Sequence, residues 1–197
     1  MKRFLLCLLC IVMVFLVTAC KKANEADLEP PLEKIEPPVV TNPEDMVWGQ
    51  EDEFITKEFD RGNGKVYVKS TVHYNHLGYR NTFQTDMFTV ETGEDYEKFS
   101  VNNTDGYFTV KAKAFGNLDE TLAEVKKNNK IETEASIMID ETEGYAYLLK
   151  DKEQKTEIFV LEKNRIVYTI TVVQPSEDPD EVYKQAIDDA IFSIEFK

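Results

Sequence analysis

Residues 135–173 read ASIMIDETEGYAYLLKDKEQKTEIFVLEKNRIVYTITVV. Four segments of this stretch are rich in the β-branched and aromatic residues that favour strands: Ala135–Asp140, Tyr145–Lys150, Thr156–Lys163 and Arg165–Val173. Polar segments between them are predicted turns: Glu143-Gly144, Asp151–Lys155 and Lys163-Asn164. Connections this short join antiparallel neighbours, so the sequence predicts an antiparallel meander here.

A helix is predicted immediately before this meander. Asn117 is a suitable N-cap, and Glu120 stands three residues later, as in a capping box. Apolar residues then recur at helical spacing, namely Leu118, Leu122 and Val125. Asn128-Asn129 is the predicted end of this helix.

A second helix and a short strand are predicted after the meander. Asp178 is the expected cap, Pro179 takes the first helical position, and Glu181 follows three residues after the cap. The apolar residues of this helix share one face: Val182, Tyr183, Ala186, Ile187, Ala190 and Ile191. The final predicted strand is Ser193–Phe196.

More strands are predicted before the first helix. Phe54–Phe59 and Lys65–Tyr74 flank the turn signal Gly62-Asn63-Gly64. Asn81–Val90 suits one or two strands, and Tyr107–Phe115 alternates between apolar and polar residues. We therefore predict an α+β fold: an antiparallel sheet of about six to eight strands with two helices packed on it.

The N-terminus has the pattern of a secretion signal. Lys2 and Arg3 supply positive charge, Phe4–Val17 is apolar throughout, and Thr18-Ala19 adds small residues before Cys20. The apolar run is short for a membrane-spanning helix, which needs about 20 such residues. We expect residues 1–19 to be removed.

Val17-Thr18-Ala19-Cys20 resembles the lipobox of bacterial lipoproteins. The resemblance implies that a diacylglyceryl group is attached to the Cys20 sulfur and that cleavage makes Cys20 the first residue. Two acyl chains anchor a protein stably where one binds marginally. We therefore expect a lipid-anchored protein on the extracytoplasmic face of a bacterial membrane, with palmitate-type acylation. An ordinary signal peptide or an uncleaved anchor is the alternative.

Lipidation would leave the mature chain without a free thiol. Cys7 and Cys10 lie in the leader, and Cys20 is consumed by lipid. Disulfides, thiolate metal sites and a cysteine nucleophile are then excluded.

Residues 20–47 are predicted to be a disordered tether, because residues 21–47 hold five of the seven prolines among Glu and Lys. Residues 48–197 are the predicted folded domain. The formal net charge is −14 and becomes about −16 when Lys2 and Arg3 leave. Such a charge repels phosphate backbones and argues against nucleic-acid binding.

The order of elements from residue 87 to residue 197 resembles the PsbP-like fold, which lipoproteins of the DcrB type share. The segments that carry the resemblance are MFTVETGEDYEKF, YFTVKAKAFGNLDETLAEV, IVYTITVVQP and DEVYKQAIDDAIFSIEF. It implies an α+β architecture and a binding or assembly role, and no functional residue is transferred. Residues 48–86 have no counterpart in it and would add strands or a flap.

The sequence offers few candidate catalytic or metal-binding residues. His73 and His76 form H-x-x-H, and imidazole suits Zn, Cu or Ni. However, residues three apart on a strand point to opposite faces, so two surface histidines are the simpler interpretation. No cofactor is predicted.

Hydrolase and calcium signatures are also missing or incomplete. The serines lie in no catalytic motif: Ser70, Ser100, Ser136, Ser176 and Ser193. Residues 102–106 lack ligands for calcium, so a turn is expected. A set of tyrosines suits either a binding platform or cross-strand packing: Tyr67, Tyr74, Tyr79, Tyr107, Tyr145, Tyr147 and Tyr168.

These observations favour a non-catalytic binding or assembly module of the cell envelope. It would reach the membrane through lipid on Cys20, and its partner would be an envelope protein or polymer. A solute-binding lipoprotein that serves a transporter is the first alternative, and an envelope hydrolase is the second.

Overall fold

The computed structural model describes residues 51–60, 65–150, 154–177 and 181–197. Several predictions fall outside these residues. They are the signal segment 1–19, the lipidated Cys20, the tether 20–47, the turn Gly62-Asn63-Gly64, and the cap and first position Asp178 and Pro179. Within the described part of the chain, no helix is long and apolar enough to cross a membrane.

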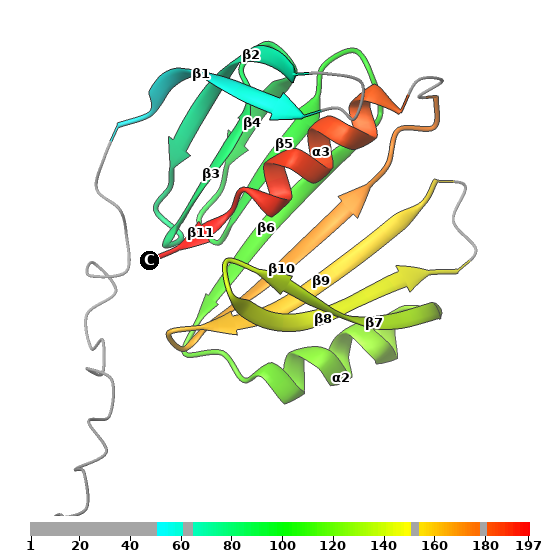
Figure 1. Cartoon of the computed structure of the whole chain (residues 1–197). Helices are drawn as coiled ribbons and strands as arrows, with labels where there is room; N and C mark the ends of the chain where they lie inside the picture. The colour runs from blue at the N-terminus through cyan, green and yellow to red at the C-terminus, as the bar shows by residue number, and fades with distance from the viewer. Residues whose placement is uncertain (1–50, 61–64, 151–153, 178–180) are drawn as a thin grey trace, which may run out of the picture. The chain divides into compact units, whose positions relative to one another are not determined.

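The described residues form eleven strands in two antiparallel sheets (Figure 1). The four-stranded sheet has the order β1-β2-β3-β11, with bounds Glu53–Asp60, Lys65–Tyr74, Tyr79–Gln84 and Glu195–Phe196. The seven-stranded sheet has the order β4-β5-β6-β10-β9-β8-β7. Its bounds, in that order, are Phe88–Thr92, Tyr96–Val101, Tyr107–Ala114, Ile166–Val173, Thr156–Lys163, Thr142–Leu149 and Ile131–Ile139.

Two helices complete the fold and confirm the predicted α+β class. They are α2, Leu118–Asn128, and α3, Val182–Phe192. The strands divide between two sheets, which the sequence did not predict. Residues 53–84, which include the predicted added strands, supply three of the four strands in the smaller sheet.

The seven-stranded sheet is buried on both faces at its centre. Successive residues of β9 alternate: Phe159 and Leu161 join the larger core with α3, whereas Ile158 and Val160 pack with Val125 of α2. A strand that is covered on both sides needs apolar residues at nearly every position. This explains the continuous apolar runs of β9 and β10.

The tight turns of the meander differ from the predicted ones. The β7–β8 turn is Asp140-Glu141, with φ of 48° and 57°, instead of Glu143-Gly144. This prediction was wrong because two non-glycine residues adopt the left-handed conformation that two-residue hairpins need. Gly144 instead lies within β8, where a Cβ atom would approach the Val160 carbonyl oxygen to 2.6 Å. The β9–β10 turn is Asn164-Arg165, one residue later than predicted.

The first helix agrees with the prediction, whereas the second begins at a later residue than predicted. The Asn117 side chain accepts a hydrogen bond from the Glu120 backbone N–H at 3.1 Å and caps α2. In contrast, α3 begins at Val182, and Glu181 before it has a φ of 53°. Glu181 is therefore the N-cap residue, not a residue of the first turn as predicted.

Candidate functional site

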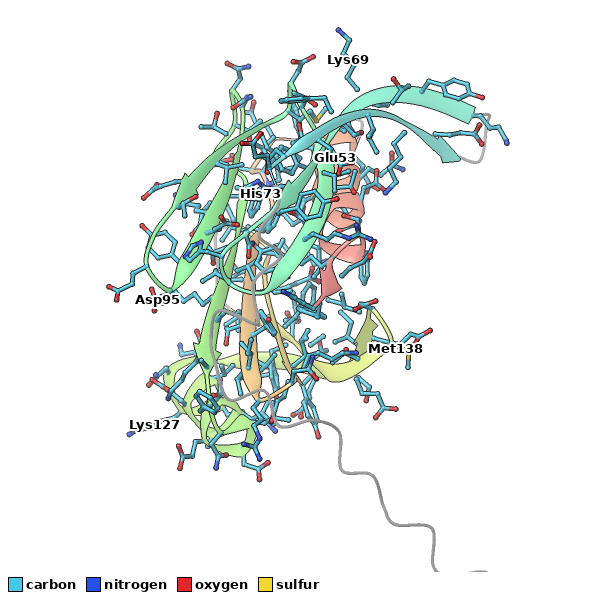
Figure 2. All side chains as sticks on the ribbon, turned by 90° about the vertical axis from the view of Figure 1, so that its left-hand side faces the viewer. Glu53, Lys69, His73, Asp95, Lys127 and Met138 are labelled. Atoms are coloured by element: carbon cyan, nitrogen blue, oxygen red, sulfur yellow. The ribbon has the colours of Figure 1, made fainter. Side chains whose placement is uncertain are left out.

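The β1–β2 hairpin is the most exposed apolar part of the described chain. Its strands pair without a register shift from Glu53 opposite Val72 to Asp60 opposite Lys65. The side chains of Phe54 and Tyr67 are 77% and 67% exposed. Figure 2 shows the hairpin extending past the other strands, with its side chains open to solvent.

Both faces of this hairpin carry exposed apolar side chains. Residues directly opposite each other share a face, so the register places Phe54 and Tyr67 on one face. Ile55 and Val66 are exposed on the other face. A strand pair that covers a core normally hides one of its faces. At Val66 and Tyr67 this pair covers neither face, whereas Ser70 and Thr71, further along β2, are buried. The exposed part has the arrangement of a contact surface.

Polar contacts hold Tyr67 on its own hairpin. The Tyr67 hydroxyl donates to the Glu58 carboxylate at 2.8 Å, and Lys65 Nζ lies 2.5 Å from the same group. The hydrogen bonds from Lys65 and Tyr67 lower the pKa of Glu58. The phenol ring is therefore positioned on the hairpin surface although solvent surrounds it.

A carboxylate–imidazole–carboxylate cluster lies at the base of the hairpin. His73 of β2 has Nδ1 at 2.8 Å from Asp52 Oδ1, just before β1. Its Nε2 lies 3.2 Å from both carboxylate oxygens of Glu97, in β5. The cluster thus joins the start of the hairpin to the other sheet, and Figure 2 labels His73 between these two regions.

Glu97 is a buried carboxylate with several donors. Its side chain is 1% exposed. Asn75 Nδ2 donates to it at 2.7 Å, the Tyr79 hydroxyl at 2.9 Å and the Thr92 hydroxyl at 3.3 Å. A buried charge needs such partners to offset its loss of hydration.

The pKa values of the central pair move apart. Burial has the largest single influence on each group and disfavours its charged form, lowering the pKa of His73 and raising that of Glu97. The hydrogen bonds and charges outweigh burial in both. Glu97 and Asp52 raise the pKa of His73, and His73, Tyr79 and Asn75 lower the pKa of Glu97. The cluster therefore favours an imidazolium between two carboxylates.

This arrangement is suited to structural linkage more than to proton transfer with a substrate. Both ring nitrogens of His73 already face carboxylates, and its ring meets Phe83 and Phe99 edge-on at centroid distances of 6.1 and 5.9 Å. A catalytic base needs a free nitrogen within reach of a reacting proton.

The two histidines of the H-x-x-H pattern have separate partners. Nε2 of His76 lies 3.2 Å from the Glu94 carbonyl oxygen, whereas His73 binds Asp52 and Glu97. Among the residues that the structure describes, no group of three or more His, Cys, Asp or Glu side chains could hold a metal ion. The structure therefore does not bring His73 and His76 into one site.

The other sequence candidates are dispersed. Tyr79, Tyr147 and Tyr168 are buried in packing contacts, while Tyr67 and Tyr145 are exposed on different sheets, so the tyrosines do not form one platform. The hydroxyls of Ser70 and Ser193 donate to backbone carbonyls, and that of Ser176 donates to Asp105.

Residues 102–106 form the expected turn. The Asp105 carboxylate accepts hydrogen bonds from the backbone N–H and the hydroxyl of Ser176, at 3.0 and 2.7 Å. The Asn102 side chain bonds to Thr89 and to the Asp86 carbonyl oxygen. These side chains are thus occupied within the fold.

The sequence did not indicate the partners of His73. The strand YEKFSV, β5, buries Glu97, Phe99 and Val101 on one side. The first buried position of β5 is a glutamate, which interrupts the apolar–polar alternation typical of a strand. Neither this strand nor its buried charge was therefore predicted. The sequence did contain one signal: Phe99 and Val101 are two residues apart, and the same spacing toward the N-terminus reaches Glu97.

The fold and this site define an α+β antiparallel protein with a projecting hairpin joined to its body by a charged cluster. No protein-family model matches the sequence, and no curated protein matches it. Solved structures that are similar include a protein from Bacteroides thetaiotaomicron VPI-5482, at 14% identity and a TM-score of 0.43. That match covers 60% of this chain and 45% of the other, so this chain spans less than half of that protein's length.

Two further structures are similar over most of their own length. Cyanobacterial PsbP (CyanoP) from Synechocystis sp. PCC 6803 has 10% identity and a TM-score of 0.43, and the match covers 72% of this chain and 92% of CyanoP. Protein PA94 from Pseudomonas aeruginosa has 12% identity and a TM-score of 0.30, with 66% and 92% covered. Similarity at these levels assigns no function to this chain.

Proposed function

We propose that this protein is a lipid-anchored, non-catalytic binding module on the extracytoplasmic face of a bacterial membrane, and that the β1–β2 hairpin contacts its protein partner. The anchoring part rests on the N-terminal signal and on Val17-Thr18-Ala19-Cys20. The binding part rests on the exposure of Phe54 and Tyr67. Exposed aromatic side chains of this kind are enriched where proteins meet.

The geometry of the hairpin supports a protein partner. β1 is an edge strand of its sheet, so alternate backbone groups face away from β2. Bulges and prolines commonly prevent further pairing at an edge strand. The described β1–β2 pairing has no bulge, and the β1 sequence EFITKEFD has no proline. A partner can therefore use backbone hydrogen bonds along β1 together with the apolar side chains of either face.

Site-specific photocrosslinking tests the binding part. Benzoylphenylalanine would replace Phe54 or Tyr67 in one set of cells and Lys127, exposed on α2, in the control. We expect one protein to be crosslinked from both hairpin positions and not from position 127. Identical products from all three positions, or no product from the hairpin, would contradict the proposal.

The anchor is tested separately with a Cys20→Ser variant. We expect the native protein to partition into detergent and to carry the mass of a diacylglyceryl group on Cys20. The variant should partition into the aqueous phase. A native protein with an unmodified residue 20, or with its leader intact, would contradict the anchoring part and leave the hairpin part to be judged by crosslinking.

A further inference from the structure

The cluster at the base of the hairpin needs two N–H donors at once. Asp52 and Glu97 lie on opposite sides of the His73 ring, one at each nitrogen. An ionised carboxylate only accepts hydrogen bonds, and a neutral imidazole has a single N–H. Only the protonated ring can therefore donate to both carboxylates.

Deprotonation of His73 has unequal consequences for its two neighbours. Glu97 is 1% exposed and cannot replace a lost donor with water, whereas the Asp52 side chain is 39% exposed. The remaining N–H is therefore better placed on Nε2, toward Glu97, because a lost donor costs a buried charge more than an exposed one. The lone pair of Nδ1 then faces the Asp52 carboxylate, and the two repel each other. Asp52 keeps the hydrogen bond from the Tyr74 backbone N–H, at 3.2 Å, as its remaining contact with β2.

We infer that Asp52, His73 and Glu97 form a pH-dependent latch, which holds the first residues of β1 on the body of the protein while His73 is protonated and releases them when it is neutral. The inference rests on the proposed function in that the hairpin is taken as the contact surface. It adds a means by which the surroundings control that surface.

The charged and aromatic groups around His73 are few. Asp52 faces it from the start of β1, Glu97 and Phe99 from β5, and Phe83 from β3. Among the described residues, the charges that act on its ionisation are those of Glu97 and Asp52. Both are negative, so they favour the protonated ring, and the pKa of His73 is raised from its ordinary value of 6.5 although burial opposes this.

The direction of the pH response follows from these charges. The latch is closed at mildly acid pH and opens as the pH rises through the raised pKa of His73. His73 contacts Asp52, which directly precedes β1, so the loosening is expected in the first residues of β1, 53–56. A protein outside the cytosol meets the pH of its surroundings directly, so such a latch would respond to the medium.

Amide hydrogen exchange on the full chain in detergent tests this inference. Exchange would be corrected for intrinsic rates and compared between about pH 6, below the ordinary histidine pKa, and about pH 9. We expect protection over residues 53–56 to fall about fivefold at the higher pH, the scale of a partly exposed ion pair. Protection in β10 reports global unfolding and should change only as much as the free energy of unfolding does between the two pH values.

Two variants make the result specific. Asp52→Asn removes the exposed carboxylate and leaves Glu97 paired, so residues 53–56 should lose their pH response. His76→Gln, which alters the histidine bound to the Glu94 carbonyl, should respond like the native chain. An equal pH response in native and Asp52→Asn proteins, or none in the native chain, would overturn the latch.

These outcomes are independent of partner binding. Exchange is measured on the purified chain, so the latch can fail while crosslinking from Phe54 and Tyr67 succeeds. In the same way, β1 can respond to pH as described while no partner is captured, which would reject the proposed function and keep the latch.

Discussion

The phenol of Tyr168 donates a hydrogen bond of 3.0 Å to the Leu77 carbonyl oxygen, which is 91 residues away in sequence. Tyr168 lies in β10 of the seven-stranded sheet, and Leu77 lies between β2 and β3 of the smaller sheet. Both are buried, and burial raises the pKa of Tyr168. One side chain thereby ties the hairpin-bearing sheet to the centre of the larger one.

Tyr168→Phe should lower the free energy of unfolding by about 1–2 kcal/mol, because it leaves the buried Leu77 carbonyl without this donor. Urea denaturation followed by tryptophan or tyrosine fluorescence and circular dichroism measures this change. Tyr145→Phe, at an exposed position, is the matched control and should differ from the native chain by less than about 0.5 kcal/mol. Equal midpoints for the two variants would contradict the importance of the bond.

The His73–Glu97 pair should confine maximal stability to a window of pH. The pKa of Glu97 is lowered from 4.5, so its contribution is complete above that value and is lost as pH falls through the lowered one. The pKa of His73 is raised from 6.5, so its contribution is complete below that value and is lost as pH rises through the raised one. Unfolding midpoints measured across pH should therefore decline on both sides.

Glu97→Gln should remove the acid limb of this window and lower the pKa of His73. Since His73 loses its buried counter-ion, we expect a destabilisation of about 3 kcal/mol at neutral pH. NMR titration of the imidazole, in a His76→Gln background so that one histidine remains, reads the pKa directly. A His73 pKa that is unaltered by the substitution would show that the pair does not interact as the structure describes.

Gly144→Ala should destabilise the seven-stranded sheet by about 2 kcal/mol, because the new methyl group would press on the Val160 carbonyl oxygen. For a chain of this size that corresponds to a fall of about 4–8 °C in the thermal midpoint. Ala146→Ser, at a neighbouring position of the same strand, offers a control that adds one atom where a Cβ already fits. A thermal midpoint equal to the native one would contradict the close approach.

Replacing Phe54 and Tyr67 together by serine should separate binding from stability. The two side chains are largely exposed, so the free energy of unfolding should change by less than about 0.5 kcal/mol for each. The protein should be more soluble. Partner capture by benzoylphenylalanine placed at Val66, an exposed residue of the same hairpin, should disappear. A loss of folding, seen by circular dichroism, would mean that these residues support the fold instead of a contact.

Local chemistry made part of the fold predictable. The helix at Leu118–Asn128 follows from a cap, a nearby glutamate and apolar spacing, all within one short segment. The α+β class followed in the same way from strand and helix patterns. The division into two sheets depends on pairings such as Phe196 with Tyr79, which no local pattern specifies.

The candidate site was less predictable because its members are far apart in sequence. His73 drew notice through its spacing to His76, yet its partners Asp52 and Glu97 are 21 and 24 residues away. In a chain so rich in carboxylates, sequence alone cannot single out the two that meet the imidazole. The exposure of Phe54 could not be predicted either. A strand pattern predicts a covered face, but it does not specify which residues cover that face.

The place of β11 in the smaller sheet bears on how the protein is made. β11 follows every other described strand in chain order, yet it pairs with β3, which precedes it by more than a hundred residues. A nascent polypeptide that emerges N-terminus first would leave one edge of β3 unpaired until Glu195 and Phe196 of β11 have emerged. Protection by a holding chaperone during synthesis is therefore most needed over residues 79–84.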